Sequence, residues 1–371
     1  MAQRIEQIFA VTAPGLESVC AAELRQSVGV HGQVEPGGVA FSGGPRELYL
    51  ANLWLRSASR ILVRVGEVTA RDFPSFHRKT LQLPWGRYLR SGVPLQVRAS
   101  SKGSRLVHTG RIAETLVAAI KRTIGSADPK AGVAEQLLIA RMEDDRCLLS
   151  IDSSGELLHR RGYRTDGAQA PLRETLAAGI LQLLGWDGMR PLLDPLCGSG
   201  TFLIEAALLA ANQAPGSERD FAFTHWPHFR AGAWQLLCDE AQRGVRSSSV
   251  VIVGSDRDAD SVAAARANAK RAGCARMIDV HCHDFADLRP PAGPPGLILC
   301  NPPYGLRVGG EGDLRPFYQR LGAVWRQQFS GWQVALFCPA GPLPAATGLP
   351  LQPVAELRNG GLPVTLFSCQ L

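Results

Sequence analysis

The first 160 residues mix short strand patterns with amphipathic helical patterns. Residues 5–11 look like a strand, and residues 16–28 repeat apolar positions at helical spacing until Gly29. Similar elements follow to about residue 68. A second group of helices and strands, closed by two strand patterns that flank Asp144-Asp145, reaches about residue 160. These patterns predict two small α+β domains, residues 1–68 and 69–160.

Beyond residue 171 the chain alternates regularly between apolar strand patterns and helical patterns. The strand patterns lie at residues 192–195, 250–255, 276–281, 297–300 and 333–338. Such alternation is typical of a parallel sheet with helices on both faces. We therefore expect residues 161–371 to form an α/β, Rossmann-like domain. We also expect a hairpin at Asn359-Gly360-Gly361 and a folded, aromatic-rich insertion between residues 215 and 249.

The net charge of +7 is unevenly distributed along the chain. Residues 1–170 hold 23 Lys and Arg against 16 Asp and Glu, whereas residues 171–371 hold 17 of each. A basic module joined to a neutral one suggests that the first binds a polyanion and the second carries out chemistry. The alternative is that Arg is simply abundant, since the chain has 35 Arg and 5 Lys.

The sequence does not favour a membrane protein or a metal-binding protein. No charge-free apolar run approaches the length of about 18 residues that a membrane span needs, and the acidic residues and Pro14-Gly15 turn near the N-terminus do not fit a secretory signal. We expect a cytoplasmic protein. No two of the nine Cys have Cys-x-x-Cys spacing, and the ligands in His281-Cys282-His283-Asp284 would point to opposite faces of a strand. We predict no metal site.

A candidate cofactor loop follows the first strand pattern of the third domain. It reads Asp194-Pro195-Leu196-Cys197-Gly198-Ser199-Gly200-Thr201 and leads into a helical pattern. Gly198 and Gly200 allow close approach of the backbone to a ligand, but the spacing matches neither a dinucleotide fingerprint nor a P-loop. The Asp194 carboxylate suits an ammonium group such as that of S-adenosylmethionine. A plain tight turn is the alternative.

Acidic residues also follow the next two strand patterns. Asp256 is placed to accept hydrogen bonds from ribose hydroxyls, and Asp284, with backbone amides nearby, could read the amino edge of an adenine. Each could instead cap the helix that follows it, because Asp is a favoured N-cap. Together with Asp194 they place an acid after three successive strands, which favours the binding interpretation.

The strand at residues 297–300 runs into Asn301-Pro302-Pro303-Tyr304. Two prolines stiffen the backbone and remove two amide donors. The amide oxygen of Asn301 and the carbonyl of Pro302 can then accept from one NH2 group and aim its lone pair at a methyl carbon. Tyr304 offers a flat face for an extruded base. The motif predicts methylation of an exocyclic amine, with a rigid turn as the alternative.

At this point the chain resembles a known family. Besides the cofactor loop and residues 301–305, the resemblance rests on residues 9–17, on Leu158-His159-Arg160-Arg161-Gly162-Tyr163-Arg164, on residues 170–177 and on Leu357-Arg358-Asn359-Gly360. These segments resemble the class I RNA methyltransferases with an N-terminal THUMP domain that make N2-methylguanosine in large-subunit (23S) ribosomal RNA. Some members carry a second methyltransferase domain, and we expect only one here.

The resemblance implies a ferredoxin-like domain at residues 1–68, a THUMP domain at 69–160 that grips structured RNA, and a methyltransferase domain with an antiparallel final strand at 161–371. It implies that Asn301 and Tyr304, with Pro302 and Pro303 between them, act on the guanine, and that Arg160, Arg161 and Arg164 are candidates for RNA phosphate contacts. The candidate site for S-adenosylmethionine comprises Asp194, Cys197, Gly198, Gly200, Thr201, Asp256, Asp284, Phe285 and Asn301.

Several functions remain open. The same motif serves enzymes that methylate adenine N6 or the glutamine side chains of proteins, although the basic N-terminal module argues against a protein substrate. Relatives with this domain plan modify transfer RNA. A non-catalytic RNA-binding factor in ribosome assembly is a further alternative. Our prediction is methylation of guanine N2 in ribosomal RNA, with transfer RNA as the alternative substrate.

Overall fold

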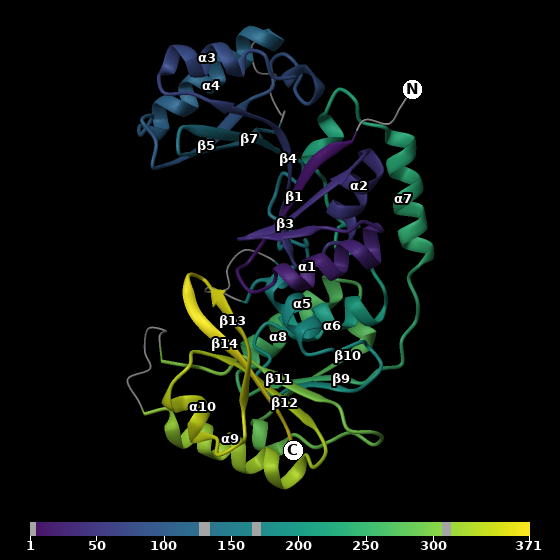
Figure 1. Cartoon of the computed structure of the whole chain (residues 1–371). Helices are drawn as coiled ribbons and strands as arrows, with labels where there is room; N and C mark the ends of the chain where they lie inside the picture. Colours follow the sequence, from purple (N-terminus) through teal and green to yellow (C-terminus); the bar gives the residue numbers. More distant parts are fainter. Residues whose placement is uncertain (1–4, 126–133, 165–171, 306–312) are drawn as a thin grey trace. The chain divides into compact units, whose positions relative to one another are not determined.

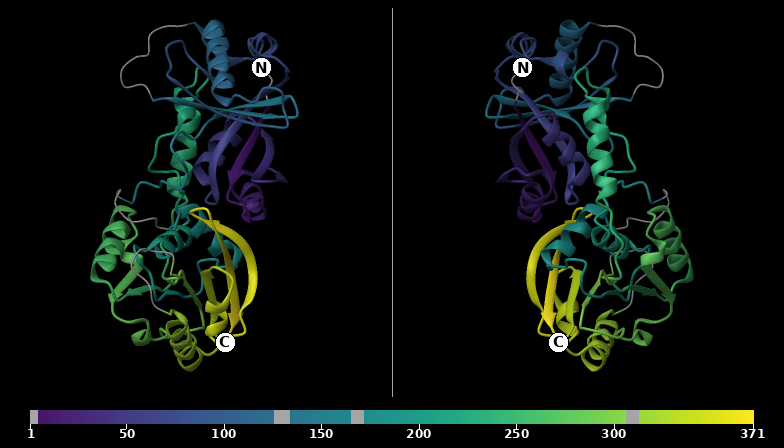
Figure 2. Two further views of the ribbon diagram at one scale, coloured as in Figure 1. Left: turned by 90° about the vertical axis from the view of Figure 1, so that its left-hand side faces the viewer. Right: turned by 90° about the vertical axis from the view of Figure 1, so that its right-hand side faces the viewer.

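A computed structural model describes residues 5–125, 134–164, 172–305 and 313–371. The chain divides into two compact units, shown in Figures 1 and 2. The first unit comprises residues 1–12, 21–158 and 219–239, and the second comprises residues 13–20, 159–218 and 240–371.

The first unit is built on one seven-stranded sheet of order β2-β3-β1-β4-β7-β6-β5. All neighbours are antiparallel except β5 and β6. The long strand β4 pairs with β1 along its first half and with β7 along its second half. The two expected N-terminal domains therefore share a continuous sheet. Its strands are β1 (Glu6–Thr12), β2 (Gln33–Glu35), β3 (Gly38–Gly43), β4 (Ala58–Thr69), β5 (Leu95–Lys102), β6 (Gln136–Glu143) and β7 (Arg146–Asp152).

A row of apolar side chains crosses this sheet. Ile8, Val63 and Ile151 lie side by side on β1, β4 and β7, and all three are fully buried. Helices α2 and α3 pack against β4, and α4 packs against β5. Helix α1 continues into a π-helical turn, Leu24–Val28, which Gly29 ends with a left-handed backbone. The helices are α1 (Glu17–Glu23), α2 (Pro45–Trp54), α3 (Phe73–Thr80) and α4 (Thr109–Ile124), with a short 3-10 helix η2 (Trp85–Arg87).

The aromatic-rich insertion is folded, as predicted, and most of it belongs to the first unit. It contains the 3-10 helix η3 (Ala222–His225) and helix α7 (Ala231–Arg243). Phe223 stacks on Tyr49 with ring centroids 4.6 Å apart, and Trp226 Nε1 donates to the buried Gln136 Oε1 at 2.9 Å. A segment within the third predicted domain thus completes the core of the first unit.

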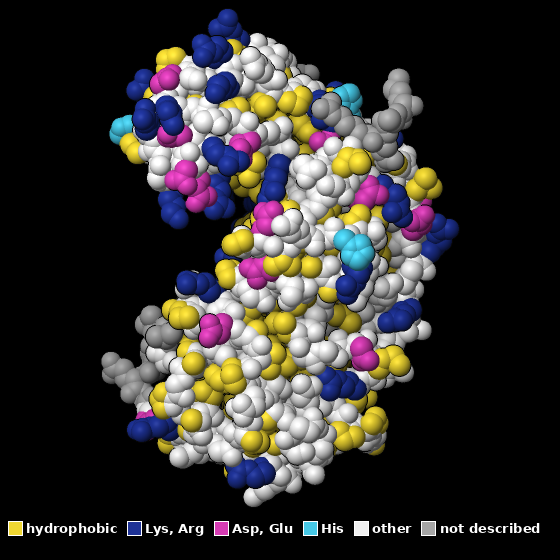
Figure 3. Space-filling model, viewed as in Figure 1, with side chains coloured by type: hydrophobic (Ala, Val, Ile, Leu, Met, Phe, Trp, Pro, Cys, Tyr) yellow, Lys and Arg dark blue, Asp and Glu magenta, His cyan; other side chains and the backbone are white. Residues whose placement is uncertain are grey.

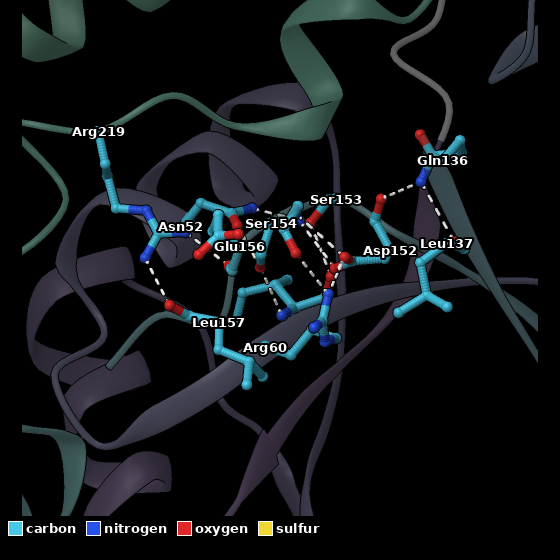
Figure 4. A network of polar contacts seen from close by, with 12 residues as sticks. Asn52, Arg60, Gln136, Leu137, Asp152, Ser153, Ser154, Glu156, Leu157 and Arg219 are labelled. Carbon is cyan, nitrogen blue, oxygen red and sulfur yellow. Dashed lines mark hydrogen bonds and ion pairs between the residues drawn. The ribbon is translucent and has the colours of Figure 1, made fainter. Parts of the chain in front are cut away.

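A buried polar network joins the end of β7 to α2 and to the start of the insertion (Figure 4). Arg60 and Asp152 form an ion pair, and Asp152 also accepts from the amides of Ser154 and Gly155. Asn52 exchanges hydrogen bonds with Ser153 and Ser154 at 2.9 and 2.8 Å. Because each buried charge finds an opposite charge or a hydrogen bond, the network can fix the turn at residues 152–155 without leaving a desolvated group unpaired.

The second unit has a sheet of order β10-β9-β8-β11-β12-β14-β13. Its first five strands are parallel and β14 runs antiparallel to β12, which confirms the predicted Rossmann-like sheet with its antiparallel final strand. The hairpin turns at Gly360 and Gly361, both with positive φ. The strands are β8 (Leu192–Asp194), β9 (Ile252–Asp256), β10 (Ile278–Cys282), β11 (Leu297–Cys300), β12 (Gln333–Cys338), β13 (Gln352–Asn359) and β14 (Leu362–Gln370).

Two apolar layers cover this sheet. Leu297 and Leu299 of β11 pack in the cluster that contains side chains of α5, α6 and α8, whereas Ile298 and Cys300 pack in the cluster that contains α9. The alternation places helices on both faces. The helices are α5 (Glu174–Leu183), α6 (Thr201–Ala210), α8 (Ala259–Arg271), α9 (Arg315–Gln328) and α10 (Pro342–Ala346), with short 3-10 helices η4 (Ala275–Met277) and η5 (Phe285–Asp287). Among the described residues of both units, none of the helices could cross a bilayer.

Candidate functional site

A cleft of about 820 Å³ opens at the carboxyl ends of β8, β9 and β11 in the second unit. The chain places β9 and β10 on one side of β8, and β11 and β12 on the other. A reversal of this kind is where open α/β sheets bind ligands. The cleft brings together nearly all the predicted site residues: Asp194, Cys197, Gly198, Thr201, Asp256, Asp284, Phe285, Asn301, Pro302, Pro303 and Tyr304.

The loop after β8 is held by its own backbone and by β9. The amide of Cys197 donates to the carbonyl of Ser255 at 2.9 Å, and that of Gly200 donates to the carbonyl of Cys197 at 2.8 Å. Gly200 does not line the cleft. Its φ of +82° starts helix α6, and a Cβ there would lie 3.1 Å from Cβ of Ala265. Gly200 therefore shapes the loop, because a larger residue would strain the turn.

Asp194 is a buried acid at the end of β8. Its side chain accepts from the amide of Leu196 at 3.1 Å, and no cation among the described residues pairs with it. Burial, and secondarily the negative charge of Asp256, hold the pKa of Asp194 well above its ordinary value. A buried carboxyl group of this kind is costly to ionise unless a cation joins it. The site therefore fits a ligand that brings a positive charge.

Asp256 holds the loop from the neighbouring strand. Its Oδ2 accepts from the amide of Gly198 at 2.9 Å, and its Oδ1 accepts from the amide of Asp258 at 3.1 Å. The cap of helix α8 is Asp258, which accepts from the amide of Ser261. Asp256 is thus not the helix cap that the sequence left as an alternative, and each of its oxygens keeps capacity to accept a hydroxyl donor.

Asp284 follows β10 by two residues and caps η5, accepting from the amide of Ala286 at 2.9 Å. It has a second partner that sequence reasoning missed. Arg320 of α9 reaches both carboxylate oxygens, at 3.1 and 3.3 Å, and its guanidinium lies 5.0 Å from the ring centroid of Phe285. The apolar spacing of Tyr318, Leu321 and Trp325 could have revealed helix α9 in the sequence.

The motif after β11 presents one unsatisfied acceptor. Asn301 Oδ1 is buried and has no hydrogen-bond partner among the residues that the structure describes. The carbonyl of Pro303 accepts from the hydroxyl of Tyr318 at 3.1 Å, and the hydroxyl of Tyr304 accepts from Asn359 at 3.4 Å. Tyr318 and Asn359 were not predicted as site residues. They fix the backbone and the ring of the motif, while the Asn301 oxygen remains available to a donor.

The structure corrects the prediction that the arginines near residue 160 all contact RNA phosphates. Arg161 is almost fully buried 3.6 Å from Glu205, and Arg164 donates to Thr201 at 2.5 Å and lies 3.4 Å from Glu174. These two side chains hold the start of α6 from behind the cofactor loop, so they do not present their charges to an RNA phosphate as expected. Arg160 is exposed and remains a candidate. Ala170 and Pro171 of the family-like segment lie outside the described residues.

The tract at residues 281–284 spreads its side chains as a strand does. His281 is paired with Asp279 at 2.9 Å and stacks on the ring of His283. No group of potential ligands that could hold a metal ion occurs within the described part of the chain.

Comparison with known proteins agrees with this geometry. Residues 161–365 match the family described as RMKL-like, methyltransferase domain, and residues 7–62 match the RlmL ferredoxin-like domain. A Synechocystis protein named "Putative RNA methyltransferase" is 37% identical over 98% of this chain and 96% of its own length. The Syntrophotalea carbinolica "Ribosomal RNA large subunit methyltransferase K/L" is 36% identical over 98% of this chain, which spans 53% of that relative.

Solved structures show the same architecture over nearly the whole chain. One described as "a putative methyltransferase complexed with SAH" has a TM-score of 0.90 and 32% identity, covering 99% of this chain and 98% of its own. A "predicted N6-adenine-specific DNA methylase" from Listeria monocytogenes has a TM-score of 0.89 and 31% identity, covering 98% and 96%. The chain thus belongs to the RMKL-like methyltransferase family, and its second unit has the fold of S-adenosylmethionine-dependent methyltransferases.

Proposed function

We propose that this protein transfers a methyl group from S-adenosylmethionine to N2 of guanine in ribosomal RNA, with 23S RNA as the substrate. The observation that carries the proposal is the buried Asn301 Oδ1, which lies in the same cleft as Asp194. In the part of the chain that the structure describes, the Asn301 oxygen has no hydrogen-bond donor and the Asp194 carboxylate has no counter-ion. The Asn301 oxygen is suited to orient an amine, and the Asp194 carboxylate is suited to bind a cationic cofactor.

The residues of the cleft fit the cofactor. Asp194 would hold its ammonium group, Asp256 its ribose hydroxyls, and Asp284 with Phe285 its adenine. Cys197, Gly198 and Thr201 would form the wall beside the methionine portion, and Gly200 sets the turn that lets them do so. When bound, the cofactor supplies an electrophilic methyl group on a sulfonium.

The chain's own residues would act on the amine. An exocyclic NH2 group donates two hydrogen bonds, and the motif offers Asn301 Oδ1 and the carbonyl of Pro302 to accept them. The carbonyl of Pro303 is engaged by Tyr318, which leaves Pro302 as the proline carbonyl without a partner among the described residues. Fixing both N–H groups orients the nitrogen lone pair and favours its pyramidal form as the reaction proceeds. Tyr304 would stack on the extruded base.

An RNA substrate is supported by charge and by the relatives' names. Residues 69–152, the larger part of the proposed THUMP domain, hold 14 Lys and Arg against 8 Asp and Glu. Lys and Arg side chains gather over the part of the first unit that holds α3, α4 and β5 (Figure 3). Basic surfaces of this kind bind phosphate backbones. Curated relatives are named for RNA and large-subunit ribosomal RNA.

Methylation in vitro tests this proposal. The purified protein is incubated with isotopically labelled S-adenosylmethionine and, separately, with unmodified 23S RNA, 16S RNA and transfer RNA, and the digested nucleosides are identified by mass spectrometry. We expect labelled N2-methylguanosine from 23S RNA. Label in N6-methyladenosine would refute the guanine assignment, label only in transfer RNA would refute the ribosomal substrate, and an inactive protein would refute the enzyme.

A further inference from the structure

Arg320 and Asp284 form a two-point contact at the wall of the cleft. Nη2 of Arg320 lies 3.1 Å from Oδ1 of Asp284, and Nη1 lies 3.3 Å from Oδ2. Arg320 reaches this position from helix α9, whose Tyr318, Leu321 and Trp325 are fully buried. The guanidinium is therefore delivered to Asp284 by a rigid element, not by a loop.

Folding stability does not account for this pair. The side chain of Arg320 is 57% exposed and that of Asp284 is 32% exposed, and ion pairs that reach water contribute little to stability. Helix α9 is already anchored by its buried aromatic face. Both residues nevertheless line the cleft together with Phe285, over whose ring the guanidinium lies. Their placement indicates a role in the site.

The hydrogen bonds leave a defined vacancy on the Asp284 carboxylate. Its Oδ1 accepts from the Ala286 amide and also lies 3.1 Å from Nη2 of Arg320, so a hydrogen bond and an ion pair both engage this oxygen. Its Oδ2 accepts only from Arg320 among the described residues. One acceptor position on Oδ2 remains. Arg320 thus leaves Oδ2 as the less crowded of the two oxygens, and its contacts with both oxygens fix the plane of the carboxylate.

We propose that Arg320 is a positioning residue for cofactor recognition: it holds Asp284 so that Oδ2 accepts the 6-amino group of the adenine, and thereby selects a 6-aminopurine over a 6-oxopurine. The inference rests on the proposed cofactor site. A 6-oxo group would set an oxygen against the fixed carboxylate, and a site built to receive a donor rejects a ligand that lacks it.

Binding measurements test this without turnover. Isothermal titration compares S-adenosylhomocysteine with its 6-oxo (inosine) analogue on the wild type, Arg320→Ala and Arg320→Lys. The wild type should prefer the amino ligand, and Arg320→Ala should reduce that preference about tenfold, since hydrogen bonds to charged groups are lost or misdirected. Arg320→Lys should restore the preference only in part, because a lysine cannot make the two-point contact.

Arg257→Ala is the matched control. Arg257 is exposed and lines the same cleft, so its removal takes away the same charge and should leave the preference unchanged. If Arg320→Ala loses the same affinity for both ligands, or if Arg257→Ala changes the preference as much as Arg320→Ala does, the effect of Arg320 is only that of its charge. Either result would overturn the inference.

A third variant separates this inference from the cofactor site itself. Asp284→Asn should lower the affinity for S-adenosylhomocysteine and abolish the preference. If Asp284→Asn binds both ligands as the wild type does, the assignment of the adenine site is wrong. If Asp284→Asn loses the preference but Arg320→Ala keeps it, the site stands and the positioning role of Arg320 is refuted. Thermal melting of each variant confirms that it is folded.

Discussion

Nδ2 of Asn359 lies 3.4 Å from the hydroxyl of Tyr304. Asn359 ends β13 at a two-glycine turn, 55 residues after Tyr304, and only 9% of it is exposed. The tight hairpin near the end of the chain therefore holds the aromatic ring of the reactive motif. This contact gives the family-like Leu357-Arg358-Asn359-Gly360 a role that its sequence alone did not suggest.

Breaking this contact should slow methyl transfer. Asn359→Ala and Tyr304→Phe each remove one partner of the same hydrogen bond, so each should lower kcat about 2- to 10-fold while KM for the cofactor stays constant. Because both variants lose one interaction, the double variant should be no slower than either single one. Steady-state methylation rates measure this, and multiplicative losses in the double variant would show that the two residues act independently.

Asn301→Ala should separate chemistry from cofactor binding. Loss of the acceptor leaves the amine unoriented, so we expect transfer to fall by about 100-fold or more. Affinity for S-adenosylhomocysteine, measured by titration calorimetry, should change little. Retained turnover would remove Asn301 from the mechanism.

Cofactor affinity should depend on pH through Asp194. Burial raises the pKa of this carboxyl, so below the raised pKa the free protein holds a proton there, and binding of an ammonium group must release it. Affinity should therefore rise with pH as long as the pH lies below the raised pKa, by up to about tenfold per pH unit, and should level off above that pKa. Asp194→Asn should bind weakly and lose this dependence. A wild-type affinity independent of pH would show that Asp194 does not meet the cofactor's cation.

The insertion should be needed for the stability of the first unit. Trp226→Ala removes a buried indole that packs on Tyr88 and donates to Gln136, and we expect the free energy of unfolding to fall by about 3–5 kcal/mol. Leu236→Ala, at a 61% exposed position of α7, serves as the control. Urea unfolding followed by fluorescence and circular dichroism checks this. If Trp226→Ala and Leu236→Ala have the same free energy of unfolding, the packing of the insertion does not stabilise the first unit.

Arg161 and Arg160 should behave differently. Arg161→Ala leaves the buried Glu205 without its cation and should destabilise the second unit by about 3–5 kcal/mol. Arg160→Ala should leave stability nearly unchanged, and it should reduce the salt dependence of RNA binding if the exposed Arg160 contacts a phosphate. Denaturation and filter-binding assays at several salt concentrations separate these effects. Normal stability of Arg161→Ala would contradict the structural role.

The sequence predicted features that depend on local pattern. The strands at residues 136–143, 146–152 and 297–300 were correct to the residue, and the clustering of Asp194, Asp256 and Asn301 followed from the rule that parallel strands end at one edge. The pairing of β4 with β7 could not be predicted from the sequence, because it depends on how distant segments align in the folded chain. The burial of Arg161 could not be predicted either, because its partner Glu205 lies 44 positions away in the sequence. The role of Arg320 was not predicted, because no helix was expected between residues 315 and 328, where α9 lies.

The proposed function requires that the cleft containing Asn301 methylates N2 of guanine in RNA. Nucleoside mass spectrometry of 23S RNA tests it most directly, with RNA taken from cells that lack the gene and from the same cells complemented with the wild type or with Asn301→Ala. We predict that N2-methylguanosine falls in the deletion strain and is restored by the wild type alone. An unchanged N2-methylguanosine content after deletion would rule out this methylation, and full restoration by Asn301→Ala would rule out the role of Asn301.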